Sequence, residues 1–429
     1  MSLRTAAGES AGASRATMRA AVYRGLGDVR VEERPRPRVV EPTDAVVRVT
    51  TAGICGSDLH LYRYPLAGLG EPVVLGHEAV GVVEETGGAV HGVRPGDRVA
   101  VSGAIADGTC RMCRDGLYSQ CETTLQNPLP GGVVGRLASA AARAAADGPE
   151  RAESRRLQEA LWGHHKGALL GLGPALGGLD GAQATHVRVP FADTNLLRLP
   201  DGVRDEQGVF LSDVLPVAYM GTELGGVGPE STVAVWGCGP VGLLALASAR
   251  ARGAEHLVAV DHHPERLAVA RDRLGADVVD FGKEDVVARV KALTGGRGPD
   301  VAIDCVGFRN ARRLRHRVQY ALKLETDSLD VIADAMRVVR SGGTVVVVGA
   351  YLGFANQFPV GALMERELTL RGSAVNPQRY WTDLSALIEG GQLDPSFVVT
   401  HRFPLERAAD AYRLYDRRED GAIKVLLEP

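Results

Sequence analysis

The sequence has little of several features that mark special classes of protein. Only six of its 429 residues are Cys and 5% are aromatic, and 49 basic residues nearly balance 52 acidic ones, for a net charge of -3. Six Cys are too few for a disulfide scaffold in a chain of this length. Without an excess of basic charge, nucleic acid is not expected as a partner. The 45% share of apolar residues excludes a disordered chain.

Long apolar runs are also missing. Residues 1–17 are small and polar and lack the apolar core of a signal peptide, so we expect a disordered leader with Met18 as the functional start. The uncharged stretch Ser231–Ser248 approaches the length of a membrane span, but three Gly and a Pro interrupt it. The sequence therefore predicts a cytoplasmic protein without membrane contact.

Two regions with different patterns follow each other along the chain. Residues 18–125 contain short Val-rich runs, such as Ala79–Glu84 and Arg98–Val101, which Gly, Pro and Asp turns separate, as is typical of β structure. From about Ser231, short apolar strands alternate with helical segments, which predicts a parallel sheet with helices on both faces. The expected fold class is therefore α/β.

A glycine-rich turn follows the first strand of the alternating region and opens a helix. Such glycines let the backbone approach a pyrophosphate, and an acid at the end of the next strand accepts hydrogen bonds from ribose hydroxyls and repels a 2′-phosphate. No Arg directly follows that acid, so NAD is favoured over NADP. The alternative to a cofactor site is a tight turn that binds nothing. The residues predicted to bind the cofactor are Gly237, Gly239, Pro240, Val241, Gly242 and Asp261.

Three Cys cluster in a second motif, Cys110-x2-Cys113-x7-Cys121. This spacing is typical of a closed structural zinc site, and Asp107 stands where a fourth ligand at the same short spacing belongs. A carboxylate oxygen can bind zinc, so the sequence predicts a structural ion held by these four residues. The alternative is that Asp107 only forms a turn and that the site is weak or empty.

A third group of residues that suit metal chemistry lies in two Gly-bounded loops. The first loop holds Cys55, Ser57, Asp58 and His60, and the second holds His77 and Glu78. A thiolate, an imidazole and carboxylates together suit a catalytic zinc ion with an open position. Each of these residues alone has an ordinary structural role as its alternative.

Together with these motifs, further segments give the chain a family resemblance. It resembles the zinc-dependent medium-chain alcohol dehydrogenases, and most of all their glutathione-independent formaldehyde dehydrogenase-like branch. The resemblance runs from about Met18 to Pro429, apart from an insertion at 131–160. The segments that carry it are GICGSDLHLY (53–62), LGHEAVGVVEETG (75–87), GLYSQCETT (116–124), VRVPFADTNLL (187–197), LSDVLPVAYMG (211–221), WGCGPVG (236–242), ALKLETD (321–327), LDPSFVVTHRFPLE (393–406) and DGAIKVLLEP (420–429).

The resemblance implies a role for each matching residue. Cys55, His77 and Asp213 match the ligands of the catalytic zinc, although Asp213 on its own looks like an ordinary helix cap. Glu78 matches an acid beside the metal, and Asp58 matches the acid that orients the ring of His77. The remaining matches are Ser57 and His60 as the proton relay, which passes through a ribose hydroxyl of the cofactor, and Lys424 as a contact of the cofactor pyrophosphate.

The resemblance also implies how the chain is divided. A GroES-like, mostly β catalytic domain is expected at 18–215, with the inserted segment 131–160, and it is completed by 375–429. A Rossmann domain with a doubly wound parallel sheet is expected at 216–374, with the active site in the cleft between the two. Relatives form dimers or tetramers, and a homotetramer is expected by analogy.

The expected activity is hydride transfer between an alcohol or aldehyde and NAD, with zinc as the metal, as in formaldehyde dehydrogenases. A dehydrogenase of a larger alcohol or polyol is one alternative, and an inactive NAD-binding structural or regulatory protein is another. Each of three further segments has two possible interpretations. The insertion 131–160 is a solvated helix or a loop, the apolar segment 167–179 is a pocket lining or a surface connection, and 307–328 is a cofactor cover, which permits tight NAD and aldehyde dismutation, or a solvated loop.

Overall fold

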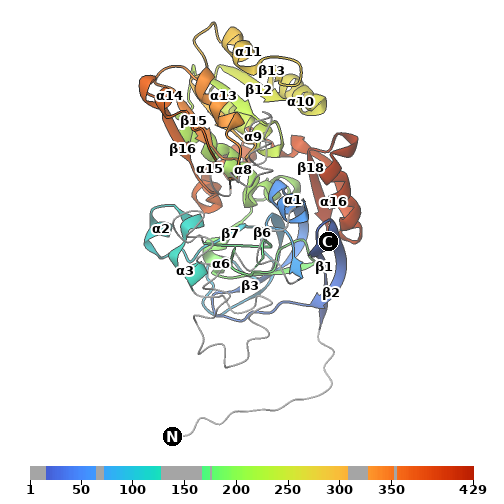
Figure 1. Ribbon diagram of the computed structural model, residues 1–429. Helices are drawn as coiled ribbons and strands as arrows, with labels where there is room; N and C mark the ends of the chain where they lie inside the picture. The colour runs from blue at the N-terminus through green and yellow to red at the C-terminus, as the bar shows by residue number, and fades with distance from the viewer. Residues whose placement is uncertain (1–15, 64–71, 127–166, 174–175, 308–326, 352–354) are drawn as a thin grey trace.

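The computed structural model describes residues 16–63, 72–126, 167–173, 176–307, 327–351 and 355–429. Figure 1 shows a part rich in strands below and, above it, a sheet flanked by helices. None of the helices in the described residues is long and apolar enough to cross a membrane. The inserted segment 131–160 and nearly all of 307–328 lie outside the described residues, so the expectations for them stay predictions.

The strand-rich part is built around a seven-stranded sheet of order β10-β6-β5-β3-β18-β17, in which β9 also pairs with β3. A three-stranded sheet, β2-β1-β4, and the pair β7-β8 complete it. The strands are β1 (Thr17–Gly25), β2 (Asp28–Pro35), β3 (Ala45–Ile54), β4 (Val73–Val74), β5 (Ala79–Thr86), β6 (Arg98–Val101), β7 (Ala104–Ile105), β8 (Ala168–Leu169), β9 (His186–Val189), β10 (Leu196–Arg198), β17 (Val399–Pro404) and β18 (Lys424–Glu428).

The last strands of the chain therefore lie beside some of the first. β18 pairs antiparallel with β3, and β17 pairs parallel with β18. Helix α16 (Ala408–Arg417) connects them and buries Tyr412 in the same apolar core as the strands. The described part of segment 167–179 also belongs to this core, because Leu170 and Leu179 are buried there, so it is not a surface connection.

The upper part is a six-stranded parallel sheet of order β13-β12-β11-β14-β15-β16. This is the doubly wound order, in which the direction of winding reverses between β11 and β14. The α/β fold class predicted from the alternating segments is thus confirmed. The strands are β11 (Thr232–Trp236), β12 (His256–Asp261), β13 (Asp277–Asp280), β14 (Val301–Asp304), β15 (Thr344–Val347) and β16 (Thr369–Gly372).

Both faces of this sheet are covered by helices. Alternate residues of β11 belong to different cores. Val233 and Val235 belong to the core that also contains residues of α8, α9, α10 and α15, whereas Ala234 and Trp236 belong to the core with residues of α11 and α13. A strand that is buried on both faces reads as an unbroken apolar run, which is why TVAVW is fully apolar after its first residue. The helices are α8 (Val214–Gly225), α9 (Pro240–Ala251), α10 (Pro264–Leu274), α11 (Val286–Leu293), α13 (Asp330–Val338), α14 (Val360–Glu365) and α15 (Pro377–Glu389).

Shorter helices connect the strands. The α-helices are α1 (Gly56–Arg63), α2 (Arg111–Arg114), α3 (Glu122–Gln126), α6 (Ala192–Asn195) and α7 (Asp205–Gly208). The 3-10 helices are η1 (Tyr118–Gln120), η3 (Val209–Ser212), η4 (Pro395–Val398), η5 (Leu405–Arg407) and η6 (Glu419–Gly421).

Candidate metal centres and cofactor site

Strand register gathers the residues predicted for the catalytic zinc at one end of the large sheet. This group is called the first cluster. β3 ends at Ile54, directly before Cys55, and its neighbour β5 begins directly after His77 and Glu78. On the other side of β3, β18 begins with Lys424. Because both neighbours run antiparallel to β3, their first residues lie beside its last ones. Four side chains from three distant segments therefore meet at one place.

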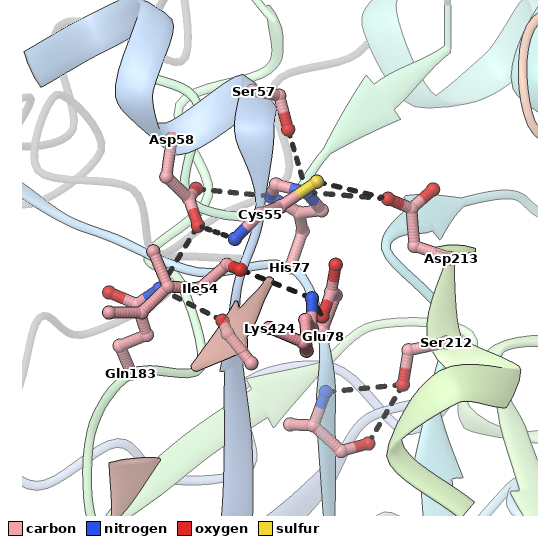
Figure 2. Close-up of polar contacts among 12 residues, drawn as sticks. Ile54, Cys55, Ser57, Asp58, His77, Glu78, Gln183, Ser212, Asp213 and Lys424 are labelled. Atoms are coloured by element: carbon pink, nitrogen blue, oxygen red, sulfur yellow. Dashed lines mark hydrogen bonds and ion pairs between the residues drawn. The ribbon is translucent and has the colours of Figure 1, made fainter. Parts of the chain in front are cut away.

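Asp213 reaches this place from the other part of the chain. It precedes α8, but its carboxylate makes no capping hydrogen bond to that helix within the described chain. The preceding Ser212 donates a hydrogen bond from its hydroxyl to Ala79 O at 3.0 Å and accepts one from Ala79 N at 3.1 Å. Since Ala79 directly follows Glu78, this pair of bonds fixes Asp213 next to the other residues, with its carboxylate turned toward Cys55 and His77 (Figure 2).

The donor atoms are spaced as zinc ligands are. Asp213 Oδ2 lies 3.6 Å from Cys55 Sγ and 3.5 Å from His77 Nε2. Ligands of a tetrahedral ion with bonds of 2.0–2.3 Å are about 3.3–3.8 Å apart. A ligand atom of Glu78 also lies within 4.8 Å of the other three. One sulfur, one imidazole nitrogen and carboxylate oxygens form a donor set that suits zinc, so these residues fit the metal.

The ring of His77 is oriented from behind by Asp58. Asp58 Oδ1 lies 3.4 Å from His77 Nδ1, on the side of the ring opposite Nε2. Asp58 Oδ2 accepts a hydrogen bond from Cys55 N at 2.9 Å, so the same carboxylate also fixes the backbone of the neighbouring donor. A proton on Nδ1 leaves the lone pair of Nε2 directed at Cys55 and Asp213.

The two residues of the predicted proton relay lie on α1. Ser57 Oγ is 3.0 Å from His77 Nε2, and the hydroxyl points into the donor cluster (Figure 2). His60 is one turn further along the same helix and is half-buried. The structure therefore places Ser57 at the cluster and His60 further from it.

Glu78 and Lys424 form a buried ion pair beside the cluster. Both residues are at most 1% exposed, and Lys424 Nζ contacts Glu78 Oε2 and donates to Ile54 O at 3.1 Å. Burial alone lowers the pKa of Lys424, but the negative charge of Glu78 outweighs it and holds that pKa above its usual range. A Cβ on Gly53 would lie 2.0 Å from Glu78 Oε2, so only glycine leaves room for the pair. Lys424 thus faces Glu78, and its predicted contact with the cofactor stays a prediction.

Burial and charge also act on the donor groups of this cluster. Burial raises the pKa of the Cys55 thiol, and the nearby carboxylate of Glu78 adds to the effect. Burial opposes charge on His77, yet the carboxylate of Asp58 and the Cys55 sulfur hold the pKa of His77 well above its usual range. Zinc binding here must therefore displace protons.

The second cluster is contained in one loop between β7 and α3. Cys110 Sγ lies 3.4 Å from Cys113 Sγ, and Asp107 Oδ1 lies 3.2 Å from Cys113 Sγ and 3.5 Å from Cys121 Sγ. All four ligand atoms are within 4.8 Å of one another. The spacing in the sequence thus brings together the four residues it predicted, and their geometry suits a closed tetrahedral site.

Asp107 is itself held firmly by its loop. Its Oδ1 accepts hydrogen bonds from the backbone N–H groups of Thr109 (3.0 Å) and Cys110 (3.1 Å). Its Oδ2 accepts from the hydroxyls of Thr109 (2.9 Å) and Thr123 (2.7 Å). Burial opposes ionisation, but these bonds outweigh it and hold the pKa of Asp107 well below its usual range. The loop therefore presents an ionised Oδ1 to the sulfur atoms.

The glycine-rich turn has the shape that a dinucleotide requires. A Cβ on Gly242 would lie 1.8 Å from Gly237 O, so the start of α9 packs on the turn at a distance that only glycine permits. Gly237 has a φ of +85°, which favours glycine. At Gly239 an added Cβ would meet only Arg266, at 3.7 Å, so the backbone is open there to a ligand. These features fit a cofactor pyrophosphate at the N-terminus of α9.

Asp261 lies beside this turn with positive charge nearby. Its carboxylate accepts hydrogen bonds from the N–H groups of Cys238, His262 and His263 at 2.6–3.0 Å. Arg266 lies 3.9 Å away, and Arg418 donates to His263 Nε2 at 2.8 Å. Burial and the neighbouring cations lower the pKa of His263 to about 4. The acid that is expected to disfavour a 2′-phosphate thus lies close to cations that attract anions.

Sequence reasoning missed several residues that support the first cluster. Gln183 is fully buried and donates to Asp58 Oδ2 at 3.0 Å, and Tyr412 donates to Gln183 Oε1 at 2.7 Å. Ser212, described above, was missed as well. None of them belongs to a motif with a spacing rule, and only their positions in the fold connect them to the site.

Comparison with known proteins agrees with these features. Residues 41–150 match the alcohol dehydrogenase GroES-like domain, and residues 240–316 match the zinc-binding dehydrogenase family. A zinc-type alcohol dehydrogenase-like protein of Schizosaccharomyces pombe is 34% identical over 414 residues, which is 96% of this chain and 91% of that protein. The solved alcohol dehydrogenase TADH from Thermus sp. ATN1 is 36% identical, with a TM-score of 0.75 over 96% of this chain and 99% of that one.

The comparisons place the chain in the family rather than in one branch of it. The glutathione-independent formaldehyde dehydrogenase of Pseudomonas aeruginosa is 34% identical, but over only 348 residues, or 78% of this chain and 75% of that protein. The expected combination of a GroES-like domain with a Rossmann-type parallel sheet is confirmed. The chain belongs to the zinc-type medium-chain alcohol dehydrogenase family of oxidoreductases.

Proposed function

We propose that the protein is a dehydrogenase that transfers a hydride between a small alcohol or aldehyde and NAD, with zinc held by Cys55, His77 and Asp213. The observation that carries this proposal is the convergence of three donor atoms, Cys55 Sγ, His77 Nε2 and Asp213 Oδ2, beside the Ser57 hydroxyl. A bound zinc ion supplies a Lewis acid that lowers the pKa of a substrate hydroxyl, and NAD supplies the hydride acceptor.

The chain's own residues divide the remaining work. Ser57 Oγ, at the edge of the donor cluster, receives the proton of the substrate hydroxyl and passes it toward His60 and solvent. Asp58 holds the ring of His77 in one orientation. Lys424 holds Glu78 by its Oε2. With Cys55, His77 and Asp213 as the three ligands, a fourth position is available to substrate.

The proposed cofactor is NAD because of Asp261, whose carboxylate would repel a 2′-phosphate. Arg266 and Arg418 lie close enough to make NADP the competing possibility. The ratio of kcat/KM for NAD to that for NADP decides between them. We expect it to exceed about 10, which corresponds to about 1.4 kcal/mol, because the carboxylate of Asp261 would repel a 2′-phosphate.

The finer proposal for the substrate is formaldehyde or a similarly small aldehyde or alcohol. It is supported by the likeness to the Pseudomonas formaldehyde dehydrogenase. In the described part of segment 167–179, Leu170 and Leu179 pack in the core, so these two side chains offer no surface to a bulky apolar substrate. Formation of methanol and formate from formaldehyde without added NAD would reveal dismutation on retained cofactor.

A panel of primary, secondary and polyol substrates, measured by NADH formation, tests the proposed function. The Cys55→Ala variant is expected to lose activity by a factor on the order of 100 or more, since even outer partners of a metal cost about 10–100-fold. It should still bind NAD, as measured by fluorescence quenching, which shows that the fold is intact. Turnover that survives Cys55→Ala would exclude this zinc mechanism, and zinc-loaded protein that binds NAD but turns over no substrate would favour an inactive binding protein.

A further inference from the structure

A chain of buried polar side chains leads from α16 to the catalytic cluster. Tyr412 donates to Gln183 Oε1 at 2.7 Å, Gln183 Nε2 donates to Asp58 Oδ2 at 3.0 Å, and Asp58 Oδ1 lies 3.4 Å from His77 Nδ1. The first three residues are 0% exposed and His77 is 5% exposed. Water therefore cannot replace any of these partners, and a lost one leaves a buried polar group unpaired.

The chemistry of the groups fixes the direction of every bond. Gln183 Nε2 faces Asp58 Oδ2 and also Gly53 O, at 3.0 Å each. A carbonyl and a carboxylate only accept, so the NH2 end of the amide must face them and its oxygen must face Tyr412. The Tyr412 hydroxyl is therefore the donor, and a flipped amide would lose both bonds to Asp58 and Gly53.

Gln183 is held by its backbone as well as by its amide. Its N–H donates to Leu75 O, and the N–H of Ala182 donates to Gly76 O, both at 2.9 Å. A Cβ on Gly76 would lie 2.8 Å from Gln183 N, so the two segments approach as closely as glycine permits. Gln183 is thus fixed directly behind the loop that carries His77.

Gln183 helps to fix the orientation of the carboxylate of Asp58. Its Oδ2 accepts from both Cys55 N (2.9 Å) and Gln183 Nε2 (3.0 Å), which fixes the plane of the group. Its Oδ1 is then directed at His77 Nδ1 (Figure 2). Without Gln183, Asp58 would keep one fixed bond and could turn about it, and the ring of His77 would lose its fixed partner.

We propose that Gln183 and Tyr412 are positioning residues for the metal ligand His77, acting through Asp58. This inference rests on the proposed zinc site, and it extends that site to α16, which lies between the last two strands of the chain. Two helices that are far apart in the sequence thereby contribute to one centre, since Asp58 lies on α1 and Tyr412 on α16.

The test compares Tyr412→Phe with Tyr62→Phe. Tyr62 lies on α1 and its ring packs on that of Tyr412, with 5.6 Å between centroids, so the control removes a hydroxyl from the same aromatic pair but not from the network. Two properties are measured: the rate at which zinc passes from the whole protein to a chromophoric chelator, and the visible absorption of the cobalt-substituted protein. The part of the zinc release and of the cobalt absorption that is absent from the Cys55→Ala variant belongs to the catalytic site.

Tyr412→Phe should release the catalytic zinc about 3–10-fold faster and shift the cobalt band, because outer partners of a metal ligand are worth about 10–100-fold and this one acts through two others. Gln183→Glu, which keeps the shape but places a second carboxylate beside Asp58, should reach about 10–100-fold. Tyr62→Phe should match the unsubstituted protein.

The outcomes separate the two proposals. Equal release rates and equal cobalt spectra for Tyr412→Phe and Tyr62→Phe overturn the inference alone. The inference is also overturned if both variants speed up zinc release in proportion to a loss of thermal stability, since that indicates a general structural role. If the unsubstituted protein carries no Cys55-dependent zinc, the proposed function fails and the inference with it.

Discussion

The two clusters that suit zinc are built in opposite ways. The donor residues of one lie within a single loop, from Asp107 to Cys121, and the loop fixes Asp107 with its own backbone and hydroxyl groups. Those of the other, Cys55, His77 and Asp213, come from three segments that only the fold brings together. The loop cluster gathers four donor residues. Under the proposed function, the other cluster holds its ion with three ligands and leaves a position free. The comparison teaches that the two candidate metal sites of this chain differ in how far apart their donor residues lie in the sequence.

The largest expected effect separates the two clusters by function. Asp213→Ala removes one catalytic ligand, and turnover should fall on the order of 100-fold or more because even outer partners of a metal cost about 10–100-fold. Because Asp213 makes no capping bond to α8, the change should lower Tm by only a few degrees. Turnover and zinc content are measured together, and turnover within tenfold of the original would show that Asp213 is not a ligand.

A chelator should remove the zinc ions of the two clusters at different rates. A zinc ion with an open position is attacked directly, so o-phenanthroline should remove the catalytic ion at least about tenfold faster than the loop ion. Activity should disappear in the fast phase, and thermal stability should fall mainly in the slow one. A single phase in which activity and stability decline together would contradict the difference between an open and a closed site.

Asp107→Cys sharpens the comparison at the loop. A fourth thiolate should strengthen zinc binding there, by about tenfold or more, because sulfur is the preferred ligand of structural sites. The two hydroxyl bonds to the charged Asp107 Oδ2 are lost, and each is worth roughly 1.5–3 kcal/mol at most before zinc binds. Competition with a chelator measures the affinity, Asp107→Ala serves as the control without a ligand, and weaker binding by the Cys variant would show that the loop is shaped for a carboxylate.

The smallest expected effect concerns a single supporting bond. Thr123→Val removes the 2.7 Å hydrogen bond to Asp107 Oδ2 and keeps the shape of the side chain. Release of the loop zinc should rise about 3–10-fold, for a bond to a charged group worth roughly 1.5–3 kcal/mol at most. The catalytic zinc should not change, and an equal rise at both sites would mean that the variant loosens the whole protein.

The sequence predicts well what depends on neighbours along the chain. Apolar runs such as TVAVW, followed by Gly237 and a helix, place the parallel sheet and its glycine-rich turn without any tertiary information. The spacing of Cys110, Cys113 and Cys121, with Asp107 three residues before, likewise defines the loop cluster. In each case the partners lie close together along the chain, so local rules suffice.

What depends on distant segments could not be predicted from spacing. Asp213 looks like a helix cap until Ser212 is seen bonded to Ala79, which turns the acid toward Cys55. Gln183 and Tyr412 carry no motif, and the ion pair of Lys424 with Glu78 follows only from the pairing of β18 with β3. Here the family resemblance supplied part of the answer and the fold supplied the reason.

The most direct test of the account is an anomalous difference map at the zinc edge from crystals of the protein. We predict a peak at about 2.0–2.3 Å from Cys55 Sγ, His77 Nε2 and Asp213 Oδ2, with His77 Nδ1 turned toward Asp58. A map without a peak there, or a peak bound through His77 Nδ1, would contradict the assignment of the catalytic centre.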